Sequence, residues 1–127
     1  MPPILLVMAG GALGAAARWG VGRAFGVSAS GWPWATLTVN VVGGLAMGLF
    51  AGWLAFRGAG GEGEAMRLFL GVGLLGGFTT FSAFSLEFML MVERGEPGHA
   101  VAYALASVLL SVLALAGGLA IARGALP

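Results

Sequence analysis

The residues best suited to chemistry lie in one stretch, GGFTTFSAFSLE at positions 76–87. Four hydroxyl side chains interrupt a segment that is otherwise apolar enough to cross a membrane: Thr79, Thr80, Ser82 and Ser85. The paired glycines at the start of the stretch favour a break in a helix. Lipid cannot satisfy free backbone N–H and C=O groups, so loosened backbone at membrane depth must be buried in protein or line a polar cavity. The stretch therefore predicts a site for something polar.

Two kinds of ligand fit this stretch. Phe81 and Phe84 are three residues apart, so they share one face of a helix. The edge of an aromatic ring is electropositive, so ring edges directed into a polar pathway attract a small anion. A break near Gly76–Thr79 would also free backbone carbonyls, and carbonyls of this kind coordinate Na⁺ in other membrane proteins.

Further polar side chains lie in the other apolar blocks. Asn40, in ATLTVNVVGG, follows Thr36 and Thr38 and has an amide whose donors and acceptor need partners in hydrocarbon. An interhelical hydrogen bond and a role in a pore both explain it. Ser107 and Ser111 are four residues apart and share a helix face, where each can bond back to its own helix or join a polar track.

Several kinds of chemistry are excluded or disfavoured by composition. The chain has no Cys, and its charges come from six Arg and five Glu with a net charge of +1, which disfavours nucleic acid as a partner. Glu87 is the one acid well inside an apolar block, and His99 lies in a turn. Acid–base catalysis normally needs a second titrating or orienting group, so the sequence disfavours an enzyme.

The elements that position these residues are four apolar blocks. With 59% hydrophobic residues in 127, the chain is predicted to be an all-α integral membrane protein forming a single transmembrane domain, residues 1–127. The helices are expected over about 3–23, 34–56, 68–91 and 100–122. The first has no basic region ahead of it and is expected to be a retained span. GAGGEGEAM (58–66) is expected to be a flexible loop and ERGEPGH (93–99) a turn.

Charge and small residues give further expectations. With both termini on one side, three arginines fall on each side of the membrane, so the positive-inside rule gives no preferred orientation. Such a chain can insert both ways, which permits an antiparallel homodimer. The glycine patterns Gly10/Gly14 and Gly44/Gly48/Gly52 predict close helix contacts.

The chain resembles the Fluc (CrcB) family of fluoride channels along nearly its whole length. Four stretches carry the resemblance: GGALGAAARW, WATLTVNVVGGLAMG, GGFTTFSAFSLE and YALASVLLS. The third is the most specific, because TTFS-x-FS-x-E after paired glycines is typical of the family. The resemblance implies an antiparallel, dual-topology homodimer of four-helix subunits with a broken third helix and two fluoride pathways.

The resemblance also implies roles for single residues. Gly76 and Thr79 would give carbonyl ligands to a structural Na⁺ at the dimer interface. Phe81 and Phe84 would flank the fluoride path, and Asn40 would be the amide needed for conduction. The other residues implied along the path are Thr38, Thr80, Ser82, Glu87, Tyr103, Ser107 and Ser111, with Arg18 at its aqueous opening.

The function expected from the resemblance is passive, selective export of fluoride through the cell (inner) membrane. Its partners would be the fluoride ion, the lipid bilayer and a second copy of the chain. The alternative is a proton-coupled small-molecule exporter, which needs a carboxylate at mid-membrane, where Glu87 would have to serve. A non-transporting assembly subunit would leave the stretch at 76–87 without a purpose.

Overall fold

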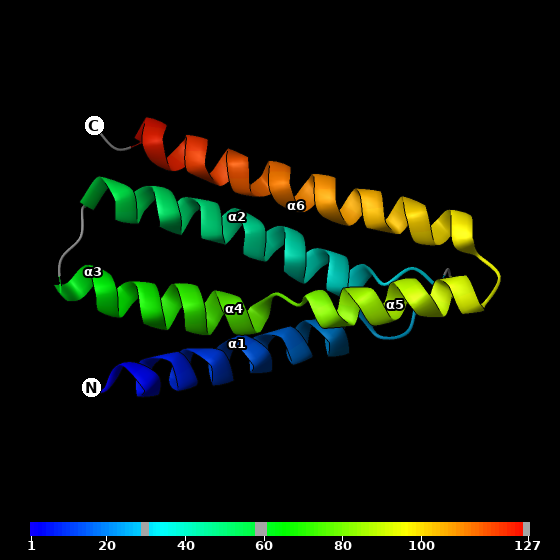
Figure 1. Cartoon of the computed structure of the whole chain (residues 1–127), viewed down its shortest axis with the longest axis horizontal. Coiled ribbons are helices and arrows are strands. Elements are labelled where there is room, and N and C mark those ends of the chain that lie inside the picture. The colour runs from blue at the N-terminus through cyan, green and yellow to red at the C-terminus, as the bar shows by residue number, and fades with distance from the viewer. Residues whose placement is uncertain (29–30, 58–60, 126–127) are drawn as a thin grey trace.

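The protein is a bundle of four long helical rods, seen in a computed structural model that describes residues 1–28, 31–57 and 61–125 (Figure 1). The helical elements are α1 (Pro3–Phe25), α2 (Trp34–Arg57), α3 (Gly61–Met66), η1 (Arg67–Leu75), α4 (Gly76–Phe78), α5 (Phe81–Glu93) and α6 (Pro97–Ala125). Within the described part of the chain, four candidate spans are long and apolar enough to cross a membrane: Pro3–Phe25, Trp34–Ala55, Gly63–Glu93 and Pro97–Gly124. The expected all-α membrane architecture is confirmed.

The third span departs from an ordinary α-helix in two places. It is built from α3, η1, α4 and α5 in succession, and η1 is a π-helix of nine residues. The thin coil between α4 and α5 in Figure 1 is the break that the sequence predicts in this span. The start of this span differs from expectation. Residues 61–66 are helical rather than loop, while 58–60 lie outside the described residues.

The start of the fourth span also differs from expectation. It begins at Pro97, three residues before the predicted start near residue 100. Proline suits the first helical position, because its missing N–H would have no partner there and its φ is already close to helical. The turn before it contains Gly95, whose φ of 81° favours glycine.

The helices pack as two close pairs, α1 against η1 and α4, and α2 against α6. A Cβ added at Gly10 or Gly14 would collide with backbone atoms of the third span, including the carbonyl oxygens of Phe69 and Leu74. A Cβ at Gly48 would collide with the Leu115 carbonyl of α6. The close helix contacts predicted from the glycine patterns are confirmed, because only a hydrogen atom fits at these positions.

The buried core is small and lies near the α5–α6 turn. Its members are Leu37, Met91, Ala100 and Tyr103, with Trp32, Val41, Phe84 and Phe88 packed against it. Many other large apolar side chains are exposed, among them Leu13, Leu105 and Leu113. Helices that are apolar on every side suit a lipid environment. The first residues of α1 and the last residues of α6 lie at the same end of the bundle (Figure 1).

Candidate functional site

The break in the third span is made by two threonines. Thr79 has φ −84° and ψ 157°, and Thr80 has φ −151° and ψ 122°, so both are extended. Gly76, expected to lie in the break, is helical, with φ −63° and ψ −39°. The break is therefore three residues later than its predicted start. Thr80 then caps α5, since its Oγ1 accepts a hydrogen bond from the Ala83 N–H at 3.1 Å.

Asn40 holds the extended backbone of Thr80 from the neighbouring helix α2. Its Nδ2 donates to the Thr80 carbonyl at 3.0 Å, and its Oδ1 accepts from the Thr80 N–H at 2.8 Å. One amide thus satisfies both backbone groups of a residue that has left the helix. Of the two explanations that the sequence allows for Asn40, an interhelical hydrogen bond and a role in a pore, the first is confirmed.

The same amide also lines a groove of about 400 Å³ between α2, the break and α6. The predicted site residues that this groove brings together are Asn40, Thr79, Thr80, Phe81, Phe84, Ser107 and Ser111. The rest of its lining is glycine and aliphatic or thioether side chains, with no charged group. The groove is therefore polar at a few points and electrically neutral.

Two hydroxyl groups in the groove are left without partners among the described residues. The Oγ atoms of Ser107 and Ser111 are buried and have no partner within hydrogen-bond distance, although the Ser107 hydroxyl lies near that of Tyr103. A buried hydroxyl without a partner is destabilising, so the position of these two atoms calls for an explanation. Phe81 lies beside them on the groove, 77% exposed, with its ring centroid 5.5 Å from that of Phe84.

Glu87 and Tyr103 lie outside this groove, deeper toward the α5–α6 turn. Tyr103 is fully buried, and its hydroxyl donates to Glu87 Oε1 at 3.2 Å. Thr36 donates to Glu87 Oε2 at 2.9 Å. Tyr103 also contacts Phe84, with ring centroids 5.2 Å apart. Thr36 is a partner that sequence reasoning did not assign, although its place one turn before Asn40 is the pattern that points to it.

Arg18, Ser82 and Thr38, which the sequence also assigns to the site, lie outside the groove. Arg18 is half-buried, and its Nε donates to the Gly77 carbonyl at 3.2 Å, which places the guanidinium beside the break. Ser82 pairs with Thr80, their hydroxyl oxygens 3.3 Å apart. Thr38 is half-buried on α2 and does not line the groove.

Gly43 is a residue of the site that sequence reasoning missed. A Cβ added there would collide with the Thr79 side chain, so the glycine lets the break approach α2. Its signal in the sequence is the Gly43–Gly44 pair, which comes about one helical turn after Asn40.

Comparisons with known proteins identify the family of the chain. The family model described as "CrcB-like protein, Camphor Resistance (CrcB)" matches residues 5–119. A protein named "Fluoride-specific ion channel FluC" from a Caulobacter species is 56% identical over 97% of this chain and 96% of its own. Proteins of the same name from Caulobacter vibrioides and Sphingopyxis alaskensis are 55% and 53% identical, each over 97% of both chains. With a family match over most of its length and four candidate spans, the chain is a multi-pass membrane protein that belongs to the CrcB-like family.

Proposed function

We propose that this protein is a fluoride-selective channel that lets the ion leave the cytoplasm passively across the cell (inner) membrane. The observation that carries the proposal is the pair of buried, unpartnered hydroxyls of Ser107 and Ser111 in a neutral groove beside Phe81 and Phe84. Relatives more than half identical to the chain are named fluoride-specific ion channels, which supports the same activity here.

The chemistry of the groove suits a small, strongly hydrated anion. Such an ion needs hydrogen-bond donors to replace its water, and hydroxyls together with ring edges supply positive charge at short range. Conduction also requires that the ion is not held too tightly. A groove without a fixed cation meets both conditions. HF enters cells as a neutral weak acid and dissociates inside, so an inside-negative potential then drives the trapped anion out.

A second copy of the chain would close the groove. In a single chain the groove is open along one side, and the Phe81 ring is 77% exposed. Val108 and Val112, apolar and exposed, stand beside the serines on α6. The balanced arginines give no orientation preference. An antiparallel homodimer with two pathways satisfies all three observations, and cross-linking in membranes tests it.

A sodium ion held between the two copies would use the break. In an unbroken helix the Thr80 N–H would donate to the Gly76 carbonyl and the Ala83 N–H to the Thr79 carbonyl. Here they donate to Asn40 Oδ1 and Thr80 Oγ1 instead. The two carbonyls are thus free of those partners, and two copies would offer four oxygens to a cation that prefers oxygen ligands. The described residues contain no cluster of three His, Asp or Glu side chains for a transition metal.

The ion supplies charge to draw these carbonyls together, so it would stabilise the dimer. Replacing Na⁺ completely by a large organic cation should lower the midpoint of thermal dimer dissociation. An unchanged midpoint, with sodium loss verified by elemental analysis, would argue against this part of the proposal.

Fluoride efflux from proteoliposomes tests the function directly. We expect fast efflux with the wild-type protein, none for chloride, and strongly reduced efflux in the double variant Ser107→Ala/Ser111→Ala. Ser85→Ala is the matched control, because the Ser85 hydroxyl donates to its own helix at Phe81 O and does not line the groove. Efflux no faster than in protein-free vesicles, from a folded sample, would refute the proposal.

The proton-coupled exporter would depend on Glu87, whose carboxylate accepts hydrogen bonds from Thr36 and Tyr103. The names of the relatives argue against it. A proton gradient that drives fluoride or drug transport in the wild type, and fails to do so in Glu87→Gln, would favour this alternative.

A further inference from the structure

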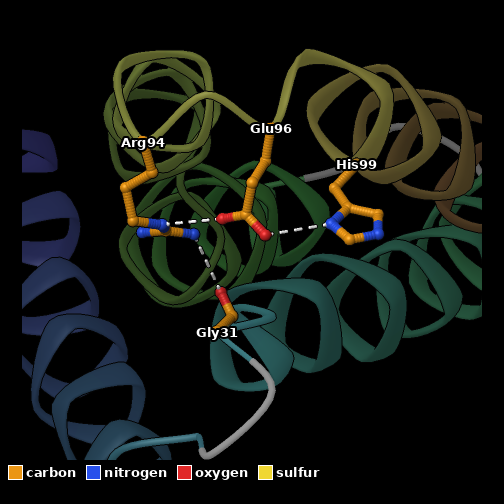
Figure 2. Close-up of polar contacts among 4 residues, drawn as sticks. All are labelled: Gly31, Arg94, Glu96 and His99. Atoms are coloured by element: carbon orange, nitrogen blue, oxygen red, sulfur yellow. Dashed lines mark hydrogen bonds and ion pairs between the residues drawn. The ribbon is translucent and has the colours of Figure 1, made fainter.

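A charged cluster lies at the end of the bundle where α5 turns into α6. Arg94 Nε donates to Glu96 Oε1 at 3.0 Å, and the other carboxylate oxygen of Glu96 is 3.1 Å from His99 Nδ1. Arg94 Nη2 also donates to the Gly31 carbonyl at 3.4 Å. Figure 2 shows the guanidinium between the turn that carries Glu96 and the chain segment that precedes α2.

Arg94 stands at the rim of a cavity of about 360 Å³, which is also lined by Gly31, Trp32 and Glu87. This cavity is the first of three cavities in which neighbours have a lining residue in common. Glu87 lines both this cavity and a second one of about 320 Å³, which Thr80 also lines. Thr80 in turn lines the groove that contains the serine hydroxyls. Glu87 and Thr80 each stand in the walls of two of these spaces, which places the three spaces in order from Arg94 to the groove.

We propose that Arg94 recruits fluoride from water at the outer end of this series, and that Glu96 reduces this attraction. The inference rests on the proposed channel function and identifies an entrance to the ion pathway. A guanidinium is permanently charged and carries five N–H donors, of which the two bonds above use two. The ligand class is a small hydrated monovalent anion.

The size of the effect follows from the charges. A unit charge about 7 Å from an ion in water changes the local ion concentration by a factor of about three at low salt. The Debye length falls from about 30 Å at 0.01 M to about 3 Å at 1 M, so salt removes the effect. Loss of the Arg94 charge should therefore slow fluoride entry, and loss of the Glu96 charge should speed it.

A structural role for the ion pair gives a different result. Arg94→Gln and Glu96→Gln each remove the Arg94–Glu96 ion pair, so a cluster that served only to hold the turn through this pair would be weakened by both. Both variants would then lower flux in the same direction, and salt would not restore it.

The test measures initial fluoride efflux from proteoliposomes at subsaturating fluoride and about 0.01 M ionic strength, where screening is weak. We expect Glu96→Gln to raise the rate about two- to three-fold, Arg94→Gln to lower it by a similar factor, and Arg94→Lys to stay near wild type. All rates should converge when an impermeant sodium salt is added to about 1 M. Glu64→Gln is the matched control, because Glu64 pairs with Arg67 at 2.8 Å and lines none of these three cavities.

Two results would overturn the inference. One is a decrease in both Arg94→Gln and Glu96→Gln that persists at high salt, and the other is no change in either variant. A wild-type protein without fluoride efflux would instead refute the channel function, so the two failures are distinguishable. Size-exclusion profiles matching wild type confirm that each variant is folded.

Discussion

Asn40→Ala removes the amide that holds the break open, and its cost can be worked out from two hydrogen bonds. The variant leaves the Thr80 N–H and C=O without the partners that they have at 2.8 Å and 3.0 Å. Interhelical hydrogen bonds in membranes average about 0.6 kcal/mol and reach about 1.7 kcal/mol, because an unfolded segment usually finds other partners. The Thr80 N–H and C=O point away from the helix, and among the described residues Asn40 is the hydrogen-bond partner of both. We therefore expect values near the upper end, about 2–3 kcal/mol for both bonds together.

The measurement is equilibrium unfolding in mixed detergent micelles, followed by tryptophan fluorescence. Val42→Ala is the control on the same helix, since Val42 is 49% exposed and its truncation removes little buried surface. Asn40→Asp should be at least as destabilising as alanine at neutral pH, because a carboxylate oxygen would replace the donor that faces the Thr80 carbonyl. A free energy of unfolding for Asn40→Ala within about 0.5 kcal/mol of wild type, below a typical single hydrogen bond, would refute the reasoning.

Further predictions concern the helix contacts, the cap and the charged turn. Gly14→Ala should destabilise the fold by more than about 2 kcal/mol, because its Cβ would collide with the third span, whereas Gly20→Ala, with open space around it, should be neutral or stabilising in the same unfolding assay. Thr80→Val should lose about 1 kcal/mol with the cap of α5, and Thr80→Ser should retain it. The hydrogen bond from Arg94, and to a smaller extent the one from His99, lowers the pKa of the Glu96 carboxyl. The ionised Glu96 therefore stabilises the fold above the ordinary carboxyl pKa, and this stabilisation is lost as the pH falls through the lowered pKa. Carboxyl NMR titration should find the pKa of Glu96 higher in Arg94→Gln, and an unchanged value would contradict the assigned cause.

The four membrane-spanning helical segments could be predicted from the apolar blocks, because a long apolar run in a membrane has few structures open to it besides a helix. The prediction of a loop at residues 61–66 is wrong, because Gly61 and Gly63 do not prevent a helix there. These residues instead extend a helix that is already nucleated by the following span, and adding a turn to an existing helix is easier than starting one.

The position of the break was harder to predict for a different reason. Gly76 and Gly77 suggested it, yet glycine permits a break without requiring one. The residues that specify it are Thr80, which caps the next helix, and Asn40, which is forty positions away in the chain. Local sequence identifies a good cap, but the contact that satisfies the vacated backbone groups depends on which helices are neighbours.

Composition also identified the hydroxyl groups of the site, but not which of them are available to an anion. A hydroxyl has one proton to donate. Thr79 donates its proton to the Leu75 carbonyl, and Thr36 and Tyr103 donate theirs to Glu87, so none of these three protons is available to an anion while the bonds last. Among the described residues no such bond is found for the buried oxygens of Ser107 and Ser111, although the Ser107 hydroxyl lies near that of Tyr103. Loss of either serine should therefore impair flux more than loss of the Thr79 hydroxyl, which should act mainly on stability. The distinction follows from hydrogen bonds between helices, and equal flux losses at all three positions would show that the paired protons are released during conduction.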